Sequence, residues 1–365
     1  MKILAIETSC DETAIALLDI KGALEKPNIK ILGNTLLSQV ALHEQYGGVY
    51  PNLAKREHEK NLPPLLNQTL REARENPEKP DLDYIAVTNG PGLEPALWVG
   101  INFATTLGKR WNKPVIPVNH MEGHLVSVLF RDENAKIKNQ NEKLELPALG
   151  LLVSGGHTEL VYIKDFGNYE IIGRTRDDAV GEAFDKAARM LGLPYPGGPE
   201  ISRLAEKARK RTTKDRIKLP RPMIHSGNLD FSFSGLKTAV LYRLQKEEKI
   251  TDIFKEDMAR AFEDAAVEVL IDKTGKALLE LEDKIVTLIV AGGVSANTYL
   301  SQELEKLVNQ FPNLTLKMPS KLLTTDNAIM IGIAAFIKIS KKPEILKNKS
   351  PIIALGNLSL TSWVR

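Results

Sequence analysis

The same strand–turn–strand pattern occurs twice in this sequence, and the repeat restricts the possible folds more than any other feature. Residues 3–20, ILAIETSCDETAIALLDI, and residues 149–164, LGLLVSGGHTELVYIK, each contain an apolar strand, a polar turn and a second apolar strand. Two such hairpins in matched register predict a duplicated α/β lobe with a cleft between the copies, although two unrelated hairpins could match by chance. A shift of 145 positions aligns Leu4 with Leu149, Ser9 with Ser154 and Thr13 with Thr158.

Segments that read as a buried strand, a turn and an amphipathic helix follow each hairpin. They include residues 83–111, which turn at Gly90-Pro91-Gly92, and residues 284–304, which turn at the two glycines of AGGVSAN. This repeated order is typical of an α/β fold. At 365 residues and 43% hydrophobic content, the chain is long enough for two lobes.

Composition excludes several classes of protein. A single cysteine, Cys10, rules out an intrachain disulfide bond. The N-terminus shows no signal-peptide pattern, and no apolar run approaches the roughly 18 residues that a bilayer span requires. We therefore expect a cytoplasmic protein with no membrane partner. A net charge of +3 permits an anionic partner without requiring one.

The heptapeptide NHMEGHL at 119–125 is a candidate metal site. His120 and His124 are four residues apart, so on a helix they share one face. A metalloprotease would need its glutamate directly after the first histidine, but Met121 stands there. Glu122 lies about 200° around the helix from each histidine, so it cannot share their metal. The alternatives for such a pair are packing or a surface position, and spacing alone selects no third ligand.

Capping residues indicate where several helices begin. Asn119 is expected to cap the helix that carries both histidines, and Ser234 to cap the helix after FSFSG. Thr325 or Asp326 is expected to cap the apolar helix of LTTDNAIMIGIAAF, and another helix should begin near Ser295 to Asn297.

Glycine-rich turns are candidate phosphate-binding loops. VSGGH and AGGVSAN each place two glycines at the end of a strand, where backbone N–H groups can approach an anion. Glu182 and Asp185 lie three residues apart on one helix face and could accept hydrogen bonds from ribose hydroxyls. Ordinary structural turns and a solvated helix face are the alternative interpretations of these features.

Seven segments in a fixed order resemble the TsaD family of tRNA N6-adenosine threonylcarbamoyltransferases. They are IETSCDETAIAL, NHMEGHL, LLVSGGHTEL, DDAVGEAFDKAARMLGLPYPGGPEIS, FSFSGLKTA, AGGVSAN and TTDNAIMIG. The resemblance extends from residue 3 to about residue 336, and HMEGH resembles the bacterial branch. The resemblance implies a two-lobed actin/hexokinase/Hsp70-like (ASKHA) fold with duplicated lobes. We place the first lobe at 1–130, a polar linker at 131–146, the second lobe at 147–339, and a tail at 340–365 that returns to the first lobe.

The resemblance also implies the ligands and the residues that hold them. One divalent metal ion, Fe²⁺ or Zn²⁺, would be bound by His120, His124 and Asp326. Asp326 is distant in sequence, so we expect the two lobes to close for it to reach the histidines. Asp11 and Glu12 match the acidic turn that faces the reacting group. An adenine nucleotide, namely threonylcarbamoyl-AMP, AMP or ATP, would contact Leu152, Val153, Ser154, Gly155, Gly156, Glu182, Asp185, Gly198 and Asn297.

The implied reaction transfers threonylcarbamoyl from threonylcarbamoyl-AMP to N6 of adenine 37, in the anticodon arm of tRNAs that read codons beginning with A. The implied partners are an inactive TsaB-like paralogue, a TsaE-like P-loop ATPase and an upstream threonylcarbamoyl-AMP synthase. Residues 203–221 contain nine Lys or Arg against two acidic residues, a pattern that fits either tRNA phosphate contact or a solvated helix. The lysine-rich tail is a weaker tRNA-binding candidate. The tRNA-binding candidates within 203–221 are Lys207, Arg209, Lys210, Arg211 and Lys214.

Two other functional classes remain open. An ASKHA-fold ATP-dependent phosphotransferase would need no His–His–Asp metal site, and a non-catalytic scaffold paralogue would lack the two histidines.

Overall fold

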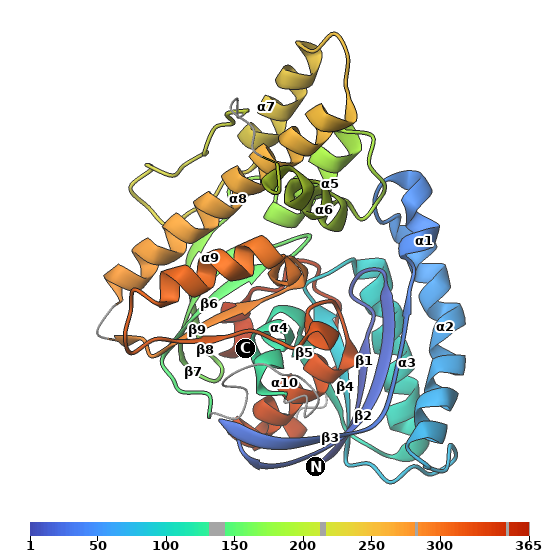
Figure 1. Cartoon of the computed structure of the whole chain (residues 1–365). Coiled ribbons are helices and arrows are strands. Elements are labelled where there is room, and N and C mark those ends of the chain that lie inside the picture. Colours follow the sequence, from blue (N-terminus) through green and yellow to red (C-terminus); the bar gives the residue numbers. More distant parts are fainter. Residues whose placement is uncertain (131–142, 212–216, 282–283, 348–349, 365) are drawn as a thin grey trace. The chain divides into compact units, whose positions relative to one another are not determined.

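Each copy of the repeated hairpin lies in its own five-stranded sheet in the computed structural model (Figure 1). The structure describes residues 1–130, 143–211, 217–281, 284–347 and 350–364. Strand β1 (Lys2–Glu7) pairs antiparallel with β2 (Glu12–Ala23), and β6 (Ala148–Val153) pairs antiparallel with β7 (Thr158–Asp165). Leu4 lies opposite Leu17, and Leu149 lies opposite Tyr162, which is the same pair after a shift of 145.

The strand order of the two sheets is also the same. The first sheet runs β3-β2-β1-β4-β5 and the second runs β8-β7-β6-β9-β10, with β1 and β6 central and parallel to β4 and β9. Because order and register agree, the expected duplicated α/β fold is confirmed and a chance match of two hairpins is excluded. The remaining strands are β3 (Lys26–Ser38), β4 (Tyr84–Gly90), β5 (Val115–Asn119), β8 (Asn168–Arg174), β9 (Thr287–Ala291) and β10 (Thr315–Lys317).

The chain divides into two compact units. Unit 1 comprises Met1–Glu145, Lys164–Tyr169 and Pro319–Arg365, and unit 2 comprises Leu146–Ile163 and Glu170–Met318. This division differs from the expected boundary at residue 339, because residues 319–339 belong to unit 1. Of the predicted linker at 131–146, only residues 143–146 are described. No helix among the described residues is long and apolar enough to cross a membrane.

Helices cover both faces of the sheet in unit 1. Leu4 and Ile6 of β1 point toward α2 and α3, where they join a buried cluster with Leu66 and Leu97. Helix α10 covers the other face so closely that a Cβ on Gly332 would lie 2.5 Å from Leu18 Cδ1. The helices of unit 1 are α1 (Val40–His43), α2 (Pro51–Glu72), α3 (Glu94–Trp111), α4 (His120–Val126) and α10 (Ala328–Lys341).

The core of unit 2 is built on one long helix, α8, with an edge-to-face contact between Phe184 and Phe262 at 5.0 Å. The expected Ser234 cap of α7 is wrong. Phe233 precedes the helix, and the carboxylate of Asp177 accepts hydrogen bonds from the backbone N–H groups of Phe233 and Ser234. The helices of unit 2 are α5 (Val180–Met190), α6 (Gly197–Arg209), α7 (Ser234–Gln245), α8 (Asp252–Glu280) and α9 (Thr298–Val308).

The C-terminal segment of unit 1 crosses the ends of β4 and β5. Leu355 N–H donates to Asn89 O at 2.8 Å, and Gly92 N–H donates to Gly356 O at 3.1 Å. Gly90 has a φ of +153°, and a Cβ there would lie 2.1 Å from Leu355 O. The close approach therefore requires glycine at position 90.

Candidate metal centre and nucleotide-binding loops

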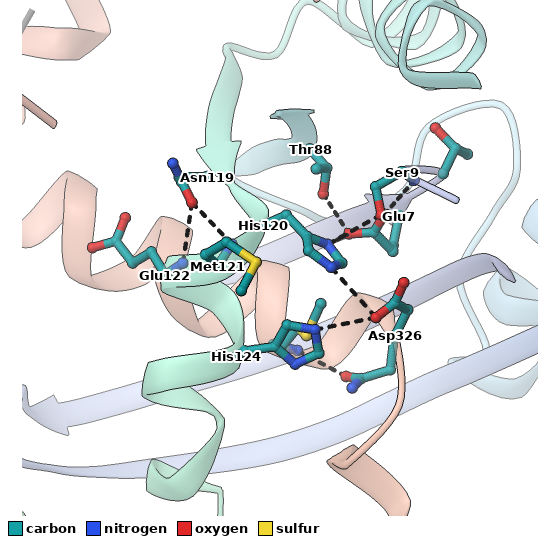
Figure 2. A network of polar contacts seen from close by, with 12 residues as sticks. Glu7, Ser9, Thr88, Asn119, His120, Met121, Glu122, His124 and Asp326 are labelled. Carbon is teal, nitrogen blue, oxygen red and sulfur yellow. Dashed lines mark hydrogen bonds and ion pairs between the residues drawn. The ribbon is translucent and has the colours of Figure 1, made fainter. Parts of the chain in front are cut away.

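Two imidazoles and one carboxylate converge within unit 1 (Figure 2). Nε2 of His120 lies 3.3 Å and Nε2 of His124 lies 3.1 Å from the same oxygen, Oδ1 of Asp326. The two imidazole rings meet edge to face at 4.7 Å. One potential ligand atom from each residue lies within 4.8 Å of the others, so the three side chains could bind one metal ion.

Local sequence explains the placement of the two histidines. Asn119 has an extended backbone, and its Oδ1 accepts hydrogen bonds from Met121 N–H at 2.9 Å and Glu122 N–H at 3.2 Å. This confirms Asn119 as the cap and starts α4 at His120. Because α4 is helical from its first residue, His120 and His124 fall one turn apart on the same face.

The position of Asp326 corrects two expectations. Neither Thr325 nor Asp326 caps α10; Asn327 does, with its Oδ1 accepting Met330 N–H at 3.0 Å. The carboxylate of Asp326 is therefore free of capping and faces the imidazoles. Closure of two lobes is not needed either, because α10 and α4 belong to the same unit. Gly123 lets the two helices pack, since a Cβ there would lie 3.1 Å from both Met330 and Ile331.

A fully buried glutamate that the sequence analysis did not identify holds His120 from behind. Glu7 Oε2 lies 3.0 Å from Nδ1 of His120 and accepts a hydrogen bond from Thr88 Oγ1 at 2.6 Å. Its other oxygen accepts Ser9 N–H. Because a carboxylate only accepts, it fixes the proton of His120 on Nδ1 and turns Nε2 toward Asp326. The sequence held no signal for this role beyond a charged residue at the end of an apolar strand.

The charges around this group fit a bound cation. Burial alone would lower the pKa of His120, but the carboxylates of Asp326 and Glu7 outweigh it and raise that pKa well above its ordinary value. The two carboxylates therefore favour a positive charge at this position. Nδ1 of His124 is buried, and among the described residues it has no hydrogen-bond partner. Two imidazole nitrogens and one carboxylate are a donor set typical of catalytic metal sites that keep an open position.

Glu122 takes no part in this group, as its helical position predicted. Tyr169 donates its hydroxyl to Glu122 Oε1 at 2.8 Å, and both side chains are buried. Figure 2 shows the Glu122 side chain directed away from His124 and Asp326. Glu122, the only acidic residue between the two histidines, therefore has a structural role and not that of a protease glutamate.

The acidic turn between β1 and β2 also lies in unit 1. Asp11 is 7% exposed, and its backbone carbonyl accepts Gln39 N–H at 3.0 Å. Burial, together with the charges of Asp326 and Asp11, raises the pKa of Glu12 to about 9. The surroundings of Glu12 thus favour the protonated form of its carboxyl group.

Several glycines of unit 2 leave open space in front of their backbone. A Cβ on Gly155, Gly156 or Gly198 would meet no atom within 4 Å. Packing therefore does not require glycine at these three positions, whereas a Cβ on Gly181 would lie 2.6 Å from Ser154 O. This arrangement brings the start of α5 against the turn after β6 and leaves the outer backbone of that turn accessible, as an anion site requires.

Other candidate nucleotide contacts have structural partners. Leu152 and Val153 are fully buried in β6, so only their backbone could contact a ligand. Asp185 accepts Gly197 N–H at 2.7 Å, while Glu182 is exposed and pairs with Lys186 at 2.7 Å. These bonds place Asp185 beside the start of α6.

Asn297 caps α9, which begins one residue after the expected range of Ser295 to Asn297. Its Oδ1 accepts Leu300 N–H at 2.8 Å, and its amide donates to Ser202 Oγ and Glu263 Oε1. Both amide protons are used within unit 2, so a ligand contact by Asn297 would involve its oxygen or its backbone.

The basic segment 203–221 begins within α6, and several of its charges form ion pairs within unit 2. Arg209 pairs with Glu263 and Asp264 and stacks on the ring of Tyr299 at 3.6 Å. Arg211 pairs with Asp257 at 2.7 Å. These two arginines therefore hold α6 to α8. Lys210 is exposed and pairs with Glu206 at 2.6 Å, Lys207 is exposed, and Lys214 lies outside the described residues.

Comparisons with known proteins point to one family. The family model for TsaD, tRNA N6-adenosine threonylcarbamoyltransferase, matches residues 30–333. A tRNA N6-adenosine threonylcarbamoyltransferase of Burkholderia ambifaria (strain MC40-6) is 45% identical over 350 residues, which cover 94% of each chain.

Two solved structures share the fold at low sequence identity. Full-length HypF in a phosphate- and nucleotide-bound form has a TM-score of 0.55 at 13% identity, covering 95% of this chain and 47% of that one. HypF of T. kodakarensis has a TM-score of 0.57 at 13% identity, covering 93% of this chain and 48% of that one. The present chain thus spans about half the length of each HypF chain.

Proposed function

Because the chain belongs to the TsaD family of tRNA N6-adenosine threonylcarbamoyltransferases, we propose that it moves a threonylcarbamoyl group from threonylcarbamoyl-AMP to N6 of adenine 37. The tRNA substrates are those that read codons beginning with A. One observation carries the proposal: the group of two buried histidines, His120 and His124, with Asp326, in which Glu7 orients His120. An ASKHA-fold phosphotransferase would have no use for this group, and a non-catalytic scaffold would not retain it.

The three side chains hold one divalent ion, Fe²⁺ or Zn²⁺, because two imidazole nitrogens and one carboxylate oxygen suit both metals. When bound, such an ion supplies Lewis-acid stabilisation of carbonyl or phosphate oxygens. The chain's own contribution is to keep both Nε2 lone pairs directed at one point. Glu7 does this for His120, and the rigid turn of α4 does it for His124.

Unit 2 binds the adenine nucleotide, as threonylcarbamoyl-AMP, AMP or ATP. The unobstructed backbone at Gly155, Gly156 and Gly198 supports this assignment, since N–H groups there can reach phosphate or ribose oxygens. Asp185 accepts ribose hydroxyls with the carboxylate that also holds the start of α6. Glu182 is a weaker candidate, because it is exposed and already paired with a lysine.

The transfer is an acyl transfer in which the exocyclic amine of adenine attacks the carbamoyl carbonyl and AMP leaves. We assign Asp11 and Glu12, in the turn after β1, to the reacting group, with Asp11 orienting the amine or accepting its proton. Holding both reactants in line can supply roughly 7–11 kcal/mol of the required acceleration. Adenine 37 lies in an anticodon loop, so presenting it costs little unstacking energy.

The tRNA contacts this chain through exposed lysines such as Lys207 and Lys210, since phosphate binding depends on accessible positive charge. The chain works with an inactive TsaB-like paralogue, a TsaE-like P-loop ATPase and an upstream synthase of the intermediate. Exposed apolar side chains support a protein contact on unit 1: Tyr46 and Tyr50 are each more than half exposed and stack at 5.6 Å. A tRNA substrate places the protein in the cytoplasm.

Reconstitution tests the proposal directly. The purified chain, the two partner proteins, threonylcarbamoyl-AMP and unmodified tRNA should yield threonylcarbamoyladenosine, detected by nucleoside mass spectrometry. The variant His124→Ala should lose both metal and product. A wild-type chain that forms no modified nucleoside but transfers phosphate from ATP to a sugar would establish the phosphotransferase alternative instead.

A further inference from the structure

A buried polar network lies beneath the turn that carries Asp11 and Glu12. Its central member is His58 of α2, which is fully buried. Nε2 of His58 lies 3.0 Å from the carbonyl oxygen of Cys10, and Nδ1 lies 2.8 Å from Oγ1 of Thr13. A single imidazole therefore spans the turn, contacting the residue just before the acidic pair and the residue just after it.

The partners of His58 fix its protonation. A carbonyl oxygen can only accept a hydrogen bond, so the Nε2 proton of His58 must be donated to Cys10 O. Nδ1 is then the acceptor for the hydroxyl of Thr13. The imidazole is neutral in this arrangement, and burial lowers its pKa, which favours the same form.

A second buried layer continues the network from His58 toward the surface. Tyr50 N–H donates to Nδ1 of His43 at 3.3 Å, so Nε2 of His43 carries the proton and donates to Gln39 Oε1 at 3.2 Å. The amide nitrogen of Gln39 donates to Nδ1 of His58 at 3.4 Å. Each of these hydrogen bonds can have only one donor and one acceptor, so the network has one consistent arrangement of protons.

Gln39 also contacts the acidic turn with its backbone. Its N–H donates to the carbonyl oxygen of Asp11 at 3.0 Å. The consecutive carbonyls of Cys10 and Asp11 are thus held by His58 and Gln39. With both peptide planes fixed, the direction in which the Asp11 side chain leaves the backbone is fixed as well.

An apolar core would stabilise this region without such a network. Buried polar groups rarely add stability over well-packed apolar residues, and their main benefit is a single defined geometry. Both histidines and Gln39 are fully buried. The two shortest side-chain hydrogen bonds of the network join His58 to Thr13 and to Cys10, at the two ends of the acidic turn. The geometry that the network defines is therefore that of the turn.

We infer that His58 and Gln39 are positioning residues that hold the Asp11–Glu12 turn in the orientation needed for attack on the carbamoyl carbonyl. This inference rests on the proposed function, in which Asp11 acts on the reacting amine. The expected effect is on turnover and not on nucleotide or metal binding, because the network lies in unit 1 and contacts none of the three metal ligands.

The test compares two substitutions at one position in the reconstituted complex. His58→Phe keeps an aromatic ring and removes both polar contacts, whereas His58→Gln keeps a donor near the position of Nε2. His58→Phe should lower kcat by roughly 30- to 100-fold, since a displacement of about 1 Å can cost that much. KM for threonylcarbamoyl-AMP and the metal content should stay within a factor of two. His58→Gln should recover at least a third of wild-type kcat.

The milder variant Thr13→Val keeps the experiment decisive if His58→Phe fails to fold. It removes one hydroxyl from Nδ1 of His58 and should lower kcat by about three- to tenfold with metal content unchanged, because Gln39 still donates to Nδ1. Wild-type kcat in a folded His58→Phe variant, alongside an inactive Asp11→Asn variant, would overturn the inference. Equal losses in His58→Phe and His58→Gln would overturn it too, since they indicate a packing role. A fully active Asp11→Asn variant would instead refute the proposed role of Asp11.

Discussion

Replacing Glu7 with glutamine should weaken metal binding sharply while leaving the fold intact. Glu7 is fully buried, and its two oxygens accept three hydrogen bonds, from Ser9 N–H, Thr88 Oγ1 and His120 Nδ1. A glutamine has the same shape, but one of its two positions is an NH₂ group. The backbone N–H of Ser9 requires an acceptor, so the amide oxygen must face Ser9 and the NH₂ group must face His120.

That orientation selects the wrong tautomer of His120. Its Nδ1 would accept from the glutamine NH₂, so its proton would move to Nε2, the atom that must offer a lone pair to the metal. Loss of such a carboxylate partner typically weakens metal affinity by about 10- to 100-fold, which corresponds to roughly 1.4–2.7 kcal/mol. We expect the upper end of that range, because the substitution also removes a buried negative charge beside the cation.

Competition titration with a chromophoric chelator would measure the dissociation constants for Zn²⁺ and Co²⁺ at pH 7.5. Thr88→Val is the matched control: it removes one hydrogen bond to Glu7 but keeps the charge, so its effect should be less than tenfold. Thermal melting of the metal-free proteins would verify that both variants fold. A Glu7→Gln protein whose metal affinity lies within a factor of two of wild type would refute the argument.

Three further outcomes are expected. Asp185→Ala should weaken AMP binding by about tenfold or more in calorimetry through loss of a charge-assisted hydrogen bond, and unchanged affinity would place the ribose elsewhere. Burial lowers the pKa of His58, so near pH 6.5 this imidazole binds a proton in the unfolded chain but not in the folded protein. Unfolding free energy from denaturant titration should therefore fall as pH drops below about 6.5, by up to about 1.4 kcal/mol per pH unit, and less steeply in His58→Gln; equal slopes would contradict this. Lys207→Glu should weaken tRNA binding and flatten its salt dependence without lowering stability. Arg209→Glu should instead destabilise unit 2, because it breaks the ion pairs with Glu263 and Asp264. The opposite pattern would locate the tRNA contact at Arg209.

Local signals in the sequence predicted the features that depend on local structure. The paired hairpins at Leu4 and Leu149 predicted a duplicated fold because strand pairing follows from alternating apolar residues and a short turn. Asn119 predicted the start of α4 because a cap accepts hydrogen bonds from backbone N–H groups only two or three positions later in the chain. Once that start is known, the shared face of His120 and His124 follows from helical geometry alone.

Features that depend on distant contacts were not predictable in the same way. Asn327, and not the acidic residue before it, caps α10, because Asp326 faces two histidines about two hundred residues away in the chain. Arg209 looked like a surface charge in the sequence, yet carboxylates on α8 neutralise it. The sequence places these partners far apart, so only the tertiary structure reveals that they meet.

The discontinuous composition of unit 1 has a consequence for biosynthesis. During translation the residues of unit 1 up to Glu145 leave the ribosome first, and all of unit 2 follows before Pro319 appears. Helix α10 and the C-terminal segment that crosses β4 and β5 therefore join the first sheet only when the chain is almost complete. Until then the face of β1 and β2 that packs against Gly332 stays uncovered, and Asp326 is missing from the group formed by His120 and His124. Unit 2 can fold as an inserted domain in the meantime, so the candidate metal site is completed only near the end of the synthesis of each new chain.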